Sequence, residues 1–410
     1  MTTRHIDRQF PLISEAELLV WCARTEVSDD LKTRIRQRLQ APLNWEVVRN
    51  MAQYHGVVPL LYRNLSAIAP DLVSSEMLGR LRRLTQAGQL LNRELAKELV
   101  VLSEVFTTSS VPVVPIKGAT LAVSAYGDLA LRDFSDLDLL VPESSIAEAQ
   151  AVLLAQGYEG GAASREPSNI HHDEGPYHVF RKKGTLSRVD LQWVMAHEHF
   201  AFRLDRPEFW KRSSPVDFEG KTIRCLSPDD LLIVLCVHGS KHAWGLLKWV
   251  CDVAELLRSH PNLDWDRCFR SATNFRCRRM LEMGLSLAHL VLDAPLPERV
   301  VATLAADPDV HALSHRMPAR LLAKREEGIT EEQAGALYFS LKDSFWDRWW
   351  CGFLLCWAHS HVATTPPSWF RWCRSLPFLA SVIIPAHRAI QYILPPAIRG
   401  AISRWVAYGG

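Results

Sequence analysis

Apolar residues recur every three or four positions through most of the first hundred residues, which is the spacing of one face of an α-helix. The pattern is clearest over 31–39 and 78–105, where Arg and Glu fill many of the positions between the apolar ones. Ser14 and Glu17 precede a run of leucines at the spacing of a capping box, which marks the start of a helix. Residues 1–110 are therefore predicted to form an N-terminal helical region.

The pattern changes at residue 111, where β-branched residues, prolines and alternating polar and apolar positions replace the helical spacing. The predicted elements are, in order, a strand over 111–116, a helix over 119–126, a strand over 134–141, a helix over 145–156, and strands over 178–181 and 188–193. Strands and helices in this order form a small mixed β-sheet with helices on one face. The predicted fold class is α+β, with a core over 111–227 in which 207–227 is transitional.

Helical spacing returns at residue 228 and predicts a helical domain over 228–363. The predicted helices lie at 229–238, 246–259, 276–292 and 345–359. Residues 364–410 are rich in Pro, Trp and Arg, so they are predicted to form a helical tail of short helices broken by proline. The Trp and Arg residues there suit either a packed module or partner-docking face, or a surface for tRNA or anionic lipid.

Composition narrows the class of protein. The 410 residues suffice for two or three domains, and 47 Lys and Arg against 45 Asp and Glu give a net charge of only +2. Such a balance gives no overall field that would attract nucleic acid or lipid. Nine cysteines without a Cys-x-x-Cys pair favour reduced thiols. With no secretory signal pattern and no apolar run of about 18 residues, we expect a cytoplasmic protein without a transmembrane segment.

Three aspartates are the candidate catalytic and metal-binding residues. Asp136 and Asp138 are two apart in a strand pattern, so both carboxylates are expected on one face, about 6–7 Å apart. Like charges on a half-buried face are unfavourable without a cation between them, and a hard divalent ion such as Mg²⁺ prefers oxygen ligands. Asp190, in another strand pattern, would complete a set of three carboxylates if the two strands are neighbours.

Other residues are candidates for binding a nucleotide. Lys117 and Gly118 end a predicted strand just before a helix, where backbone amides can cradle phosphate, and Thr120 adds a hydroxyl. Arg132 could steady a triphosphate or form a structural salt bridge. The candidates across the cleft, which could instead make structural hydrogen bonds, are His238, Lys241 and His242.

These residues together resemble a known family. The segments IKGATL at 116–121 and SDLDLLV at 135–141, with Tyr126 and Arg132 between them, are similar to nucleotidyltransferases of the DNA polymerase β-like superfamily. The pattern Lys-Gly-x-x-Leu, Tyr, Arg, Asp-x-Asp resembles an uncharacterised bacterial branch, and the later segments at 189–193 and 231–257 fit it too. The resemblance covers roughly residues 80–260.

The resemblance implies metal-dependent transfer of a nucleoside monophosphate from an NTP, with release of pyrophosphate. Asp136 and Asp138 would hold the ion that bridges the triphosphate, and Asp190 would hold a second ion and help deprotonate the acceptor hydroxyl. The other residues would position phosphates, so catalysis would consist mainly of charge neutralisation and alignment. The acceptor would be a peptide or protein hydroxyl, a small metabolite or a tRNA end, and the branch suggests natural-product tailoring.

Two positions depart from the family pattern. Gly118 is followed by Ala119 where the superfamily usually has Ser, and Gln192 stands where the branch usually has His. Two alternatives therefore stay open beside the transferase. One is a catalytically inert nucleotide- or partner-binding module of the same fold, and the other is a phosphotransferase that moves the γ-phosphate.

Overall fold

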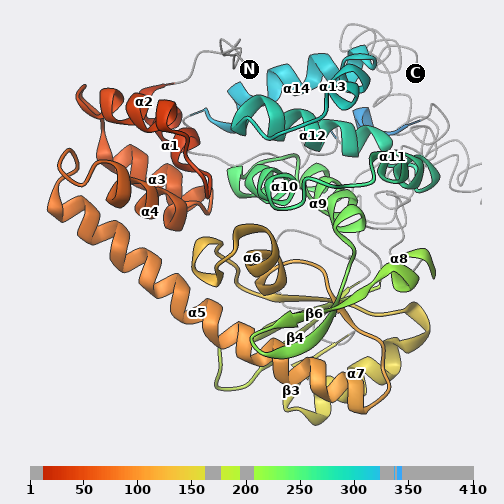
Figure 1. Ribbon diagram of the computed structural model, residues 1–410. Helices are drawn as coiled ribbons and strands as arrows, with labels where there is room; N and C mark the ends of the chain where they lie inside the picture. The colour runs from red at the N-terminus through yellow and green to blue at the C-terminus, as the bar shows by residue number, and fades with distance from the viewer. Residues whose placement is uncertain (1–12, 162–176, 194–206, 324–336, 338, 344–410) are drawn as a thin grey trace, which may run out of the picture.

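The computed structural model describes residues 13–161, 177–193, 207–323, 337 and 339–343 (Figure 1). The predicted helix over 345–359 and the predicted tail over 364–410 lie outside these residues. Of the helices within them, none combines the length and apolar character needed to cross a membrane.

The N-terminal region is helical, as predicted. Its helices are α1 (Ser14–Cys22), α2 (Asp29–Leu39), α3 (Trp45–Tyr54), α4 (Val58–Ile68) and α5 (Ser75–Thr108). Side chains of Ser28, Asn44 and Ser74 cap α2, α3 and α5 by accepting a backbone N–H three residues on. Ser14 does not cap α1: it is the first helical residue, and the N-cap is Ile13.

A small mixed sheet forms the α+β core. Its strands are β1 (Val114–Pro115), β2 (Leu137–Leu140), β3 (Tyr158–Gly160), β4 (Tyr177–Lys182) and β5 (Arg188–Gln192), in the order β1-β2-β5-β4-β3. Strands β2 and β5 are parallel neighbours, whereas the other pairs are antiparallel. The connections include α6 (Ala119–Tyr126), η1 (Leu129–Leu131), η2 (Glu143–Ser145) and α7 (Ile146–Ala155). The sheet thus places Asp138, in β2, beside Asp190, in β5.

The segment called transitional in the sequence contains regular structure. It holds α8 (Pro207–Arg212) and an antiparallel hairpin of β6 (Ser214–Phe218) and β7 (Lys221–Cys225). The connecting residues Glu219 and Gly220 both have positive φ, 52° and 75°, as a two-residue turn of this kind requires. Glutamate is unusual at the first of these positions, so the sequence pattern did not predict the hairpin.

Six helices of the described residues follow the hairpin. They are α9 (Pro228–Lys241), α10 (Leu247–Ser259), α11 (Trp265–Asn274), α12 (Arg278–Leu292), α13 (Glu298–Ala305) and α14 (Pro308–Leu321). Helix α12 packs against α9, α10 and α14. Gly284 permits this close packing, because a Cβ there would lie 2.4 Å from Cys236 Sγ and 3.0 Å from the ring of Trp244.

Two hydrophobic clusters in the described residues hold these parts together. The larger joins α1–α4 to the helices after the hairpin, and the smaller joins the sheet to α7. Helix α5 belongs to both, because Met77 and Leu81 lie in the larger cluster while Leu99 and Phe106 lie in the smaller. Figure 1 shows α5 running from α3 and α4 to the region of β3 and β4. The sheet and the helical domain therefore both pack against one long helix, α5.

His55 ties the N-terminal helices to α10. It is only 2% exposed; its Nδ1 accepts a hydrogen bond from Leu247 N at 3.2 Å, and its carbonyl accepts one from Lys248 N at 3.2 Å. Burial lowers the pKa of His55 from 6.5 to about 4, so the imidazole is neutral in the folded protein at pH 7.

The His55 pKa predicts a pH-dependent stability. Because the unfolded chain binds the proton more tightly, the free energy of unfolding should fall as the pH decreases from 6.5 to 4, by about 3 kcal/mol in total from this group. In His55→Asn, the amide oxygen can still accept the bond from Leu247 but the side chain does not titrate. Urea unfolding of both proteins between pH 7 and 4 should show the smaller decrease in the variant; equal decreases would contradict the prediction.

Candidate active site

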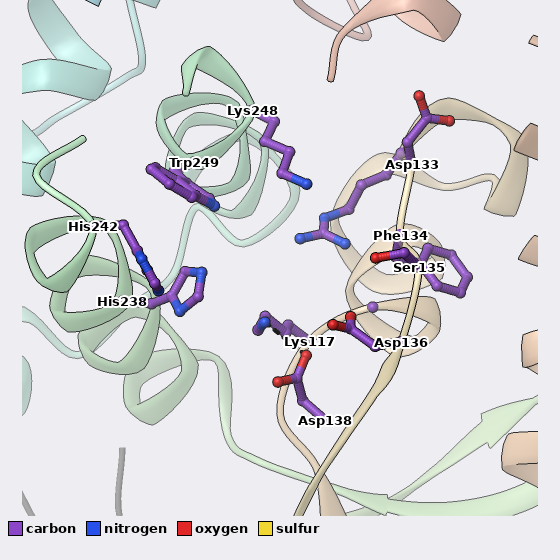
Figure 2. Close-up of a pocket in the computed structure, with 12 residues that line it drawn as sticks. Lys117, Asp133, Phe134, Ser135, Asp136, Asp138, His238, His242, Lys248 and Trp249 are labelled. Atoms are coloured by element: carbon purple, nitrogen blue, oxygen red, sulfur yellow. Dashed lines mark ion pairs between the residues drawn. The ribbon is translucent and has the colours of Figure 1, made fainter. Parts of the chain in front are cut away.

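A cavity of about 180 Å³ lies between the loops of the sheet and the helical domain, and two kinds of wall enclose it (Figure 2). Charged and polar residues line one side, from the turn before α6 and from the segment that leads into β2. The other side comes from the end of α9 and the start of α10. The residues that line it are Lys117, Gly118, Arg132, Asp133, Phe134, Ser135, Asp136, Asp138, His238, His242, Lys248 and Trp249.

The turn between β1 and α6 requires glycine. Gly118 is the N-cap of α6 with φ 71° and ψ −125°, a conformation that residues with a Cβ avoid. Thr120 Oγ1 donates a hydrogen bond to the Lys117 carbonyl at 3.3 Å, so the threonine hydroxyl stabilises the turn. The turn thereby directs the Lys117 and Gly118 backbone toward the cavity.

Asp138 carries two partners. It is 3% exposed, its Oδ2 lies 2.6 Å from Lys117 Nζ, and its Oδ1 accepts a hydrogen bond from Gln192 Nε2 at 2.6 Å. Burial acts to lower the pKa of Lys117, but Asp138 and Asp136 outweigh it and raise that pKa, so the ammonium stays charged. Gln192, the departure from the family pattern, thus holds the Asp138 carboxylate in place.

Asp190 lies directly beside Asp138, because the two residues are paired in the parallel register of β2 and β5. Arg188 donates to its two carboxylate oxygens at 2.8 and 3.0 Å. Burial, together with the charges of Asp138 and Asp136, raises the pKa of Asp190 to about 6 against the opposing effect of Arg188. Asp136 lies one residue before β2, because this strand begins later than the predicted strand over 134–141, and it lines the cavity with Asp138.

The three carboxylates do not form a ready-made metal site. Nowhere in the described ranges do three or more His, Cys, Asp or Glu side chains come together in an arrangement that could hold a metal ion. Basic side chains instead balance two of the carboxylates, Lys117 at Asp138 and Arg188 at Asp190. A bound cation would have to replace these basic partners.

Arg132 is held by the helical domain. Its Nε and Nη2 donate to the two oxygens of Asp252 at 2.7 and 2.8 Å, and Tyr126 Oη donates to Asp252 Oδ1 at 2.7 Å. Both members of the ion pair are at least 95% buried, since Arg132 is 5% and Asp252 1% exposed. The pair fixes the guanidinium, which lines the cavity, and joins the segment before β2 to α10.

The opposite wall is aromatic. The rings of His242 and Trp249 are stacked with centroids 5.1 Å apart, and the ring of His238 meets both at steep angles. Burial, together with Lys117 and the other histidine, holds the pKa of His238 well below its usual value. Lys248 lies beside these rings, and burial lowers its pKa, with the charge of Arg132 acting in the same direction.

Most of the residues proposed from the sequence line this cavity. Lys117, Gly118, Arg132, Asp136, Asp138, His238 and His242 line it. Three of the proposed residues do not line it: Thr120, Lys241 and Asp190, the last of which is paired with Asp138 in the register of β2 and β5.

Five lining residues were not proposed as site residues from the sequence: Asp133, Phe134, Ser135, Lys248 and Trp249. Lys248 and Trp249 precede Asp252 by four and three positions on α10, a spacing that places all three on one face of the helix. Once Asp252 is known to pair with Arg132, this spacing indicates that Lys248 and Trp249 face the same region as Asp252.

The glycine turn, the Asp-x-Asp motif and helices α9 to α12 all lie within the part of the chain that a family model matches. A model of the family described as uncharacterised nucleotidyltransferase matches residues 41–293, more than half of the chain, so the chain belongs to this family. The match confirms the resemblance seen in the motifs and extends it at both ends, from α3 to α12.

The other comparisons are weaker. Among solved structures, the chain is similar to an antigenic nucleotidyltransferase-like protein from Paracoccidioides brasiliensis, with 16% sequence identity and a TM-score of 0.32. The similarity covers 54% of this chain and 92% of that one. No curated protein matches the chain.

The buried ion pair predicts unequal losses of stability. Asp252→Asn leaves the Arg132 guanidinium buried without a counter-charge and should lower the free energy of unfolding by about 3 kcal/mol or more. Tyr126→Phe keeps the ion pair and removes one hydrogen bond, so it should cost about 1 kcal/mol. Denaturant unfolding of the two variants measures both values, and losses of equal size would show that the charge pair does not hold the two parts together.

Proposed function

We propose that the protein transfers a nucleoside monophosphate from an NTP to a hydroxyl acceptor and releases pyrophosphate. Membership of a nucleotidyltransferase family supports transfer of this general kind. The observation that carries the proposal is the meeting of Asp136 and Asp138 with Lys117 and Arg132 around one cavity. In the reaction, the acceptor oxygen forms a bond to the α-phosphorus while the bond to the bridging oxygen of the β-phosphate breaks.

The cations of the cavity suit a triphosphate. Lys117, Arg132 and Lys248 line it together, and the hydroxyl of Ser135 lies among them. Charge-assisted hydrogen bonds from such groups are stronger than neutral ones and are aimed in advance at the charge that develops during transfer. Since Asp252 already fixes the Arg132 guanidinium, little conformational entropy is lost when this side chain meets phosphate.

The carboxylates fit a hard divalent cation in their chemistry, because all the candidate ligands are oxygens. We propose that Asp136 and Asp138 hold Mg²⁺, and that Asp190 takes part when Arg188 turns away. The bound ion would neutralise phosphate charge and align the triphosphate. Lys117 would then leave Asp138 for a phosphate oxygen, and Asp190 would take the proton of the acceptor hydroxyl.

The acceptor is proposed by class. A peptide or protein hydroxyl or a small molecule, as in natural-product tailoring, is our leading candidate, with a tRNA end as the other. We place the reaction in the cytoplasm.

NTPs labelled at either the α- or the γ-phosphate distinguish this function from the two alternatives. We expect purified protein with Mg²⁺ and NTPs labelled at the α-phosphate to label a component of a peptide, metabolite or tRNA pool, with equimolar pyrophosphate release. Label transferred only from the γ-phosphate would instead identify a phosphotransferase. NTP binding without any transfer would identify an inert nucleotide-binding module.

The carboxylates predict the largest losses of activity. Asp136→Asn and Asp138→Asn should each reduce transfer by roughly 100-fold or more, because the charge that balances the cation is removed. Asp128→Asn is the matched control: this exposed residue caps the Ala130 N–H in the same loop, a bond that asparagine can also accept. Transfer rates of the three variants, with folding checked by thermal unfolding, test this; unchanged transfer in Asp138→Asn would overturn the assignment.

A further inference from the structure

Three aromatic side chains come together on the helical side of the cavity. His238 and His242 lie at the end of α9, and Trp249 lies at the start of α10. The ring centroids are 4.7 Å apart for the two histidines, 5.1 Å for His242 and Trp249, and 5.7 Å for His238 and Trp249. We call these three residues the aromatic wall. Figure 2 shows it across the cavity from Lys117, Asp136 and Asp138.

The aromatic wall is partly exposed and lines the cavity, unlike the nearby Trp244. Its three residues are only half-buried and line the cavity. Trp244, in contrast, is fully buried, and its ring lies so close to Gly239 that a Cβ there would meet it at 2.5 Å. Trp244 fills the core between α9 and α12, whereas Trp249 keeps ring surface available for a ligand.

The connection between α9 and α10 holds the wall in this arrangement. Ala243 and Trp244 both have φ of 52°, a left-handed conformation that is uncommon for residues with a side chain. Trp244 N donates to the Gly239 carbonyl at 2.8 Å, and Gly245 N donates to the His242 carbonyl at 3.1 Å. This tight connection brings His242 against Trp249 across only six intervening residues.

The two sides of the cavity together suit a ligand that has both a charged part and a flat ring. The ionic side suits a polyanion and its cation, whereas aromatic side chains that line a cavity suit a flat, uncharged ring system. A ligand with only phosphate groups would leave the aromatic wall in water.

We propose that His238, His242 and Trp249 form the subsite for the nucleobase, with the base stacked on the aromatic wall. This inference rests on the proposed function and deepens it. Stacking accepts any base, since every base has a π-face, so the subsite accepts all four NTPs and adds affinity beyond that of the triphosphate. Removal of the Trp249 ring should therefore reduce the affinity for an NTP by about tenfold and leave the affinity for tripolyphosphate unchanged.

Equilibrium binding tests the subsite. Titration calorimetry of the full chain with Mg²⁺ and either ATP or tripolyphosphate gives the ratio of the two affinities. We expect ATP to bind about tenfold more tightly than tripolyphosphate in the wild type, equally in Trp249→Ala, and again more tightly in Trp249→Phe, which keeps a ring. Trp45→Ala is the matched control, because Trp45 is also half-buried but lies on α3 and not in the cavity.

The outcomes separate this inference from the proposed function. If ATP binds the wild type and Trp249→Ala keeps the full preference for ATP over tripolyphosphate, the subsite is wrong and the nucleotide site stands. If neither ATP nor tripolyphosphate binds the wild type, the proposed function itself fails, and the subsite with it. Thermal unfolding of Trp249→Phe shows whether the fold is retained.

Discussion

The buried ion pair between Arg132 and Asp252 is the interaction on which the cavity depends. The two residues are 120 positions apart, and the pair connects the segment leading into β2 with the helix that carries Lys248 and Trp249. A charge as deeply buried as Arg132 is stable only with a partner. The pair therefore fixes the distance between the two walls of the cavity, and Tyr126 stabilises it from α6.

The second constraint is the balance of charge within the cavity. Asp138 and Asp190 lie side by side in register, and each is balanced by a basic side chain of this chain. A nucleotide with its cation brings charges of both signs, so partners can be exchanged without leaving a buried charge alone. This exchange would couple binding of the cation to release of Lys117 toward the phosphates.

Local patterns predicted the parts of the site that depend on one strand or one turn. Alternation placed Asp138 in a strand, and the Lys117-Gly118 pair marked the turn into α6. The partner of Arg132 could not be predicted, because no local spacing connects it to a residue 120 positions later. The hairpin of β6 and β7 was missed because Glu219 adopts a conformation that favours other residues. The role of Trp249 became visible only when α9 and α10 placed it against His242.

The central claim is that one nucleotide lies across both walls of this cavity. A crystal structure of the full chain with Mg²⁺ and an ATP analogue that has a methylene group between the α- and β-phosphates tests it most directly. The account predicts phosphate oxygens on Lys117 and Arg132, the ion on Asp136 and Asp138, and the adenine ring stacked on Trp249. An analogue bound elsewhere, for example in the separate pocket beside Tyr62 and Tyr126, would contradict it.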